Sequence, residues 1–242
     1  MTHSRFVFAS CLSLVAIGSA AAQHTHADLP AGAVISDAGS RAMAAHMVMT
    51  HLRPATTADS VRAAAIAAEL RTAIEKYRNV KRAEADGFKL FAPQIKNQRV
   101  YHFTKGRWAI ENQFRFNPAK PTSLLYRKGP RGNFILIGAM YTAPRRYSVA
   151  DLDKRVPTSI AQWHKHVNWC VPERGSESRW TEVKNGRLVF GLRGVHTRAE
   201  CESAGGRFHE QVFGWMVHAN VFEQDIWGDH QMRGDELGMQ DR

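Results

Sequence analysis

Apolar residues recur at spacings of three and four between Thr57 and Asp86, where Ile66, Leu70 and Ile74 follow one another. This spacing places apolar side chains on one face of a helix. Hydroxyl and carboxyl residues suited to capping stand at the start of the segment, and an Asp-Gly pair stands at its end. The pattern therefore predicts one amphipathic helix over residues 57–86.

After Gly87 the pattern changes to short runs of β-branched, aromatic and aliphatic residues separated by turn residues. Turn signals at GPRGN (129–133) and at Asn185-Gly186 each predict a hairpin. We expect an α+β fold, with an N-terminal amphipathic helix followed by an antiparallel β-sheet or a small β-barrel-like domain. The runs expected to be strands are VYHF (100–103), TSLLYRK (122–128), NFILIGAMYTA (133–143), QWHKHVNWC (162–170), RLVFGL (187–192) and FGWMVHANVF (213–222).

The first residues have the arrangement of a secretory signal peptide. Arg5 is followed by the apolar run FVFASCLSLVAIG and by small residues ending at Ala22. This run is shorter than the about 20 residues that a membrane-spanning helix needs. We expect a signal peptide at 1–22, a flexible lead-in at 23–57 with a short helical turn around RAMAAHMVMTHL, and a single α+β domain at 58–242. The mature protein would be periplasmic or secreted, with no membrane span.

Removal of the signal peptide leaves two cysteines, Cys170 and Cys201. Thiols oxidise in exported proteins, so a disulfide between the two is expected. The alternative, Cys170 as a thiolate metal ligand, is less favoured because a paired cysteine is not a thiolate. Beyond Cys201, Gly205-Gly206 predict a tight turn before the next strand.

The nine residues QWHKHVNWC (162–170) carry the densest candidate chemistry in the chain. In a strand, successive side chains point to opposite faces. His164, His166, Asn168 and Cys170 would then share one face, while Trp163 and its alternate neighbours would share the other. Two histidines at this spacing can both reach a single metal ion.

Two further histidines are candidate ligands of the same ion. His218 in FGWMVHANVF would supply a third imidazole and leave an open coordination position. His102 in VYHF would supply a fourth, which would close the site and favour a structural role. Because imidazole suits several transition metals, we expect a divalent ion, with zinc as the first choice and copper as the second.

The segment HMVMTH adds soft candidate ligands that copper(I) would accept, namely Met47 and Met49 beside His46 and His51. Packing is the favoured explanation for methionines on a helical turn. An alternative also stays open for the whole histidine set. The histidines would then be structural, bonded to backbone carbonyls, in a non-catalytic cell-envelope binding module.

The formal net charge of +11 at pH 7 suits anionic partners. Since no nucleic-acid-binding motif accompanies it, we expect an anionic cell-envelope component, or solubility alone, to account for the charge. No Gly-x-Ser-x-Gly elbow, His-Glu-x-x-His helix, phosphate loop or dinucleotide fingerprint is present. A metal-dependent hydrolase would need a carboxylate base such as Glu210 or Glu223, and no spacing supports one. Catalytic residues therefore stay unassigned.

Five stretches together resemble a family of uncharacterised exported bacterial proteins with the pattern WHxHxxxC…CxxxGGxF…WMxH. The resemblance spans residues 77–227 and implies no established activity, cofactor or fold. The residues that fall at positions of that pattern are His102, His164, His166, Cys170, Cys201, Gly205, Gly206 and His218. The His-x-His arrangement is also similar to the metal-binding strands of cupins, although the glycines and the glutamate of a first cupin motif are missing. The five stretches are YHFTKGRWAIENQFRFNPAKPTSLLYRKG, LIGAMYTAP, RVPTSIAQWHKHVNWC, CESAGGRF and FGWMVHANVF.

Overall fold

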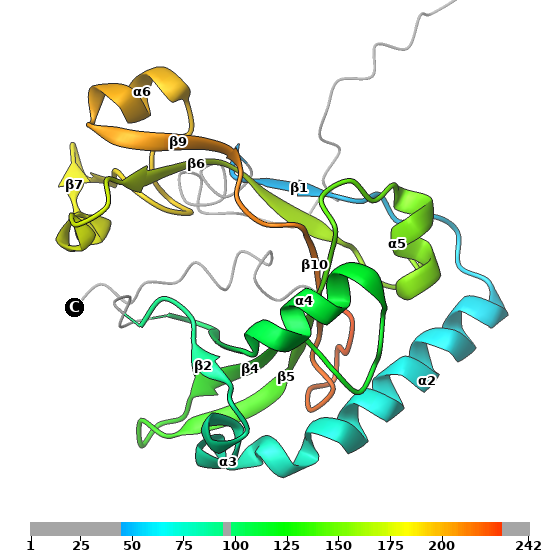
Figure 1. Cartoon of the computed structure of the whole chain (residues 1–242). Coiled ribbons are helices and arrows are strands. Elements are labelled where there is room, and N and C mark those ends of the chain that lie inside the picture. The colour runs from blue at the N-terminus through cyan, green and yellow to red at the C-terminus, as the bar shows by residue number, and fades with distance from the viewer. Residues whose placement is uncertain (1–44, 94–97, 229–242) are drawn as a thin grey trace, which may run out of the picture. The chain divides into compact units, whose positions relative to one another are not determined.

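Antiparallel strand pairing organises the protein, as seen in a computed structural model that describes residues 45–93 and 98–228 (Figure 1). One sheet has the strand order β1-β6-β10-β5-β4-β3-β2, and β9 pairs with the far part of β6. The predicted α+β class is confirmed. The edge strands β1 and β2 do not pair with one another within the described residues, so no barrel is closed. The strands are β1 (Met47–Met49), β2 (Lys89–Leu90), β3 (Tyr101–Thr104), β4 (Ser123–Lys128), β5 (Phe134–Ala143), β6 (His164–Pro172), β7 (Val183–Lys184), β8 (Arg187–Leu188), β9 (Gly206–Gln211) and β10 (Trp215–Ala219).

The helical segment predicted over residues 57–86 consists of three pieces. Thr56 caps the first piece with a capping box that includes Asp59, and the last piece stops before Gly87, whose φ is +91°. Helix α2 buries one face, including Leu70 and Ile74, as its spacing predicts. The helices are α2 (Thr57–Ile74), a 3₁₀ turn (Glu75–Arg78), α3 (Val80–Ala85), α4 (Gly106–Phe114), α5 (Val149–Arg155), a second 3₁₀ turn (Glu177–Thr181) and α6 (Arg198–Ser203).

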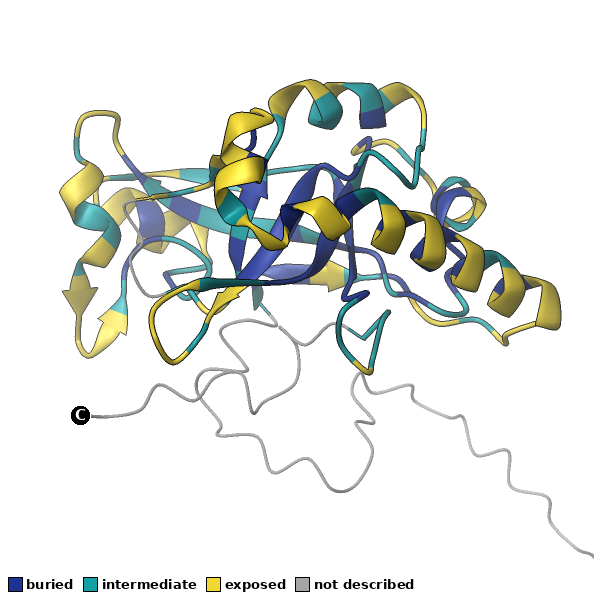
Figure 2. Cartoon of the chain, turned by 90° about the horizontal axis from the view of Figure 1, so that it is seen from below, coloured by how far each residue is buried: buried dark blue, intermediate teal, exposed yellow. Residues whose placement is uncertain are grey.

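The main core lies between the helices and one face of the sheet. Figure 2 shows buried strands beside a long helix whose outer surface is exposed. Large side chains such as Tyr126, Tyr141 and Trp163 are fully buried there. The Tyr126 hydroxyl donates to the carbonyl of Tyr77 at 2.7 Å, so a phenol in the core keeps a hydrogen-bond partner. Trp163 enters this core from the face of β6 opposite His164.

Strand β1 replaces the loose lead-in that was predicted up to residue 57. Met47–Met49 pairs with β6, so no helical turn is present at these three residues. Thr50 continues the contact, because its amide donates to the carbonyl of Trp163 at 2.8 Å. The exposed backbone of an edge strand needs hydrogen-bond partners, and β1 supplies them to β6. The predicted signal peptide, residues 1–22, lies outside the described residues.

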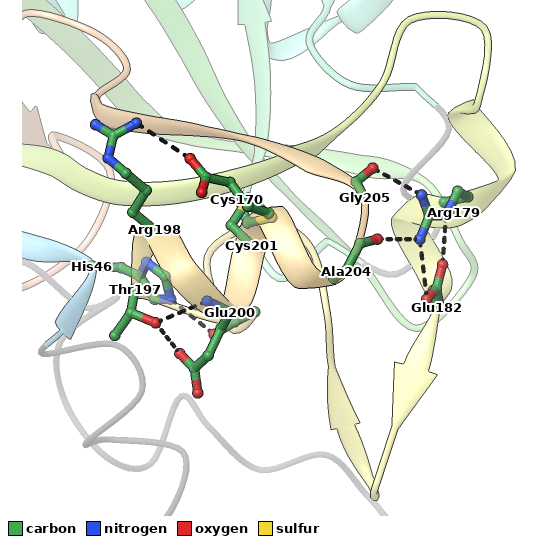
Figure 3. Close-up of a disulfide and its surroundings, with 12 residues drawn as sticks. His46, Cys170, Arg179, Glu182, Thr197, Arg198, Glu200, Cys201, Ala204 and Gly205 are labelled. Atoms are coloured by element: carbon green, nitrogen blue, oxygen red, sulfur yellow. Dashed lines mark hydrogen bonds and ion pairs between the residues drawn. A yellow bond between two sulfur atoms is a disulfide. The ribbon is translucent and has the colours of Figure 1, made fainter.

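A disulfide joins β6 to α6, as predicted (Figure 3). Cys170 and Cys201 have Cα atoms 5.4 Å apart and are buried in a small cluster with Val189 and Phe190. Of the strand predicted at 187–192, only Arg187–Leu188 is formed. Helix α6 and β9 thus pack as a unit on the far end of β6.

Arg179 ties the end of α6 to the neighbouring turn (Figure 3). Its guanidinium donates to the carbonyls of Ala204 and Gly205 at 2.7 and 3.1 Å, and it also pairs with Glu182 at 2.7 Å. Gly205 has a φ of +64°, which fits the predicted tight turn after the helix. None of the helices within residues 45–93 and 98–228 has the length and apolar character needed to cross a membrane.

Candidate functional site

The two histidines of β6 lie on the sheet face opposite the main core. His164 faces Met216 of β10 in the register, and His166 faces Met47 of β1. Residues directly opposite one another in an antiparallel pair share a face. His218, two residues beyond Met216 on β10, therefore lies on this same face. The relative exposures of His164, His166 and His218 are only 1%, 8% and 6%.

Four imidazole rings form a continuous series across this face. The ring centroids of His166 and His164 are 5.5 Å apart, and those of His164 and His218 are 5.0 Å apart. The half-buried His102 of β3 follows, 5.8 Å from His218. The structure thus brings together all four histidines singled out in the sequence. The strand register places His218 beside His164.

His102 reaches the cluster from a distant strand. Strands β4 and β5 separate β3 from β10. In a flat sheet, with strands about 4.8 Å apart, β3 and β10 would be about 14 Å apart. The contact between His102 and His218 therefore requires both side chains to lean inward over the sheet. Gly138 of β5 allows the end of β10 to approach closely, because a Cβ there would lie 2.1 Å from the carbonyl oxygen of Ala219.

The predicted alternation of side chains along β6 fails after His166. Asn168 has a φ of +55°, a left-handed conformation that asparagine tolerates better than most residues. Its side-chain amide donates to the carbonyl of Ala45 at 3.0 Å instead of facing the histidines. Trp169 consequently lies beside His166, with ring centroids 5.5 Å apart. Cys170 lies away from the site in the disulfide cluster, so it is not a thiolate ligand.

Methionines surround the histidines. Every methionine among the described residues is the direct cross-strand partner of one of these histidines, and all four are buried or half-buried. Met49 and Met216 flank His164 on its two sides, Met47 lies opposite His166, and Met140 lies opposite His218. Of these four, the sequence pattern singled out only Met47 and Met49, and it favoured a helical turn for them. Because Met216 and His218 are two residues apart, the sequence could have predicted that they share one face of a strand.

The spacing of the rings suits a shared ion, but their present orientation does not hold one. An imidazole nitrogen lies about 2.0–2.1 Å from zinc, so the centroids of two rings on a tetrahedral ion are about 5 Å apart. Within residues 45–93 and 98–228, however, no group of three or more His, Cys, Asp or Glu side chains has an arrangement that could hold an ion. Rings would have to turn about the Cβ–Cγ bond, a broad torsion in histidine.

An aromatic cleft of about 320 Å³ lies next to the cluster. Trp169 and Phe213 form part of its wall, with ring centroids 6.0 Å apart, and Phe91 extends the wall at 5.8 Å from Phe213. Arg174 and Arg207 also line the cleft. Because Trp169 contacts His166 as well, one indole ring separates the cleft from the histidines.

The remaining candidates lie elsewhere. His46 is buried, with ring nitrogens 3.3 Å from the carbonyl oxygen of Val167 and 3.1 Å from that of Gly194. His51 is exposed. Each candidate carboxylate base is held in an ion pair: Glu210 with Arg198 at 3.0 Å and Glu223 with Arg127 at 2.7 Å.

Comparisons with known proteins add no assignment. No family model matches the chain, and no curated protein or solved structure is similar to it.

Proposed function

We propose that the protein, after export, binds a transition-metal ion through the histidines of β3, β6 and β10. The observation that carries the proposal is the series of four imidazole rings contributed by three strands. These residues are far apart in the sequence, so only the folded sheet assembles them. Imidazole is the commonest protein ligand for zinc and copper, and a fixed pair on one strand with a third on its neighbour is a typical metal-ligand arrangement.

The proposed site has three main ligands, His164, His166 and His218. Three imidazoles leave a coordination position open to water or another small ligand. His102 follows His218 in the series, with ring centroids 5.8 Å apart, and it is the least buried of the four histidines. It would therefore join the ion last, if the site closes to four ligands.

A rigid frame favours binding at this position. The disulfide fixes β6 to α6 near one end, while β1 and β10 pair with β6 beside the histidines. Ligands held by rigid strands lose little conformational entropy when the ion binds. The proposal requires the imidazole rings to turn so that their nitrogens face one ion. The disulfide also agrees with export to a periplasmic or extracellular location.

Titration of the tag-free mature protein with zinc, in competition with a chromophoric chelator, tests this function. The double variant His164→Asn/His218→Asn should lose the high-affinity site, because both central imidazoles are removed. His51→Asn is the matched control, since this histidine is exposed and outside the cluster. Unchanged affinity in the folded double variant, or no affinity in the wild type for zinc or copper, would contradict the proposal.

The aromatic cleft favours a second candidate function, the binding of an anionic cell-envelope component. Two arginines, Arg174 and Arg207, line the cleft together with two carboxylates, Glu173 and Glu177. Arginine pairs with phosphate and carboxylate groups, and aromatic rings stack on planar or sugar surfaces. Co-sedimentation with cell-wall fragments should fall in Arg174→Ala/Arg207→Ala if this function is real. Equal sedimentation of wild type and variant would exclude the cleft as the binding site.

A further inference from the structure

The methionines of the described residues are confined to the histidine face of the sheet. Met49 and Met216 lie on either side of His164, and Met140 lies opposite His218. Directly opposite residues have Cβ atoms about 4.5–5.5 Å apart. A methionine side chain has three rotatable bonds, so its sulfur can reach an ion held by the neighbouring imidazole.

Thioether sulfur discriminates between the two metals expected at this site. Zinc in proteins is bound by thiolate, imidazole and carboxylate. Soft thioether ligands favour copper(I). The chain's other sulfur ligands in this part of the fold, Cys170 and Cys201, are joined in the disulfide and supply no thiolate. In an oxidising compartment, methionine is the soft ligand that remains available.

Charge points to the same metal. The candidate ligands are imidazoles and thioethers, which are neutral, and the whole chain carries a formal net charge of +11. Removing an ion from water becomes more costly as its charge increases. A buried shell of neutral ligands leaves two positive charges uncompensated around zinc(II), but only one around copper(I).

We infer that the metal of this site is copper(I), held by two of the three proposed imidazoles, His164 and His218, together with the thioethers of Met49 and Met216. This inference rests on the proposed metal-binding function and adds the identity of the ion and its sulfur ligands. Met47 lies opposite His166 and extends the same soft surface along β6.

The test compares copper(I) and zinc(II) affinities of the mature, disulfide-bonded protein. Copper(I) is measured anaerobically, with ascorbate as the reductant, in competition with bicinchoninate, and zinc with a chromophoric zinc chelator. The variant is Met49→Leu/Met216→Leu, because leucine is close to methionine in volume and removes only the sulfur. Leu136→Met in the main core makes the reverse exchange as a control.

The copper(I) dissociation constant should rise about tenfold or more in the double variant, while the zinc constant changes less than about threefold. X-ray absorption of the wild-type copper complex should show sulfur in the coordination shell. If the double variant does not fold, Met49→Leu replaces it, since Met49 is half-exposed and packs less tightly.

The remaining results of this affinity comparison separate the inference from the proposed function. Unchanged copper(I) affinity in a folded methionine variant overturns the inference. Zinc binding that depends on His164 and His218, with no copper(I) preference, overturns the inference while the proposed function stands. Failure of the wild type to bind either metal removes the proposed function, and the inference with it.

Discussion

The imidazole of His164 lies 5.0 Å, ring centroid to ring centroid, from that of His218 on the neighbouring strand. This contact depends on a register in which Met216 is directly opposite His164. From Cys201 in α6 the chain continues into β9, which pairs with β6 between Val167 and Pro172, and then into β10, which pairs with β6 at His164. The disulfide and the candidate site are therefore parts of one arrangement of β6.

Replacement of Cys201 by serine should destabilise the protein strongly. The disulfide closes a loop with a sequence separation of 31 residues, and in the chain-entropy model a loop of about this length contributes roughly 3–4 kcal/mol. Urea unfolding of Cys201→Ser, compared with the wild type, measures the loss. The double variant Cys170→Ser/Cys201→Ser is the control, because it lacks the unpaired Cys170 thiol that the single variant retains. Free thiols at both positions in the folded wild type would refute the disulfide itself.

Alanine at Gly206 should cost more stability than alanine at Gly132. A Cβ at Gly206 would lie 2.6 Å from the sulfur of Cys170 and 2.7 Å from a ring carbon of Phe190. Such overpacking costs about 1–3 kcal/mol. Gly132 has a φ of +74° and open space around it, so alanine there would strain the backbone without a steric clash. Gly205, with a φ of +64°, has the same kind of backbone strain. Thermal denaturation of the single variants tests this order, and equal melting temperatures would count against it.

Asn168 should tolerate glycine better than valine. Its φ of +55° is accessible to glycine but strongly disfavoured for a β-branched residue. Both replacements remove the hydrogen bond to the carbonyl of Ala45, so the difference between them reports the backbone conformation. We expect Asn168→Val to lose about 2 kcal/mol and Asn168→Gly distinctly less. Fluorescence of Trp169 would report whether the indole leaves His166, and an unaffected valine variant would show that this backbone conformation is not required.

Acid should weaken the attachment of α2 and α5 to the segment after β1. Hydrogen bonding to Arg53 is the main cause that lowers the pKa of Asp153 to about 2, and Thr158 contributes. A lowered pKa means that the ionised carboxylate stabilises the fold above about pH 4, and that this contribution is lost as the pH falls towards about 2. The melting temperature should therefore fall more steeply across this window in the wild type than in Asp153→Asn. Parallel curves would exclude Asp153 as a source of the acid sensitivity.

Local pattern predicted much of the fold and of the site. The start of the helix at Thr57 followed from capping residues and apolar spacing, and both needed only neighbouring residues. The shared face of His164 and His166 followed from strand geometry. The disulfide followed from the expected export and from the two cysteines that removal of the expected signal peptide would leave.

Other features depended on contacts between distant segments. Residues 47–49 form a strand because β6 has a free edge, and their own sequence contains no evidence of that edge. His218 lies beside His164 because of the register between β10 and β6, and the chain reaches β10 only after α6 and β9 have packed on β6. Asn168 was a visible candidate for a left-handed conformation, but its effect on Trp169 required knowledge of the surrounding strands.

Metal content of the native protein tests the central claim most directly. The protein would be purified without a histidine tag from its native compartment, in buffers free of chelators, and its metals measured by inductively coupled plasma mass spectrometry. We predict close to one copper ion per chain, lost in His164→Asn/His218→Asn and retained in His51→Asn. Folded wild-type protein with no stoichiometric transition metal would contradict the account and assign the histidines a structural role.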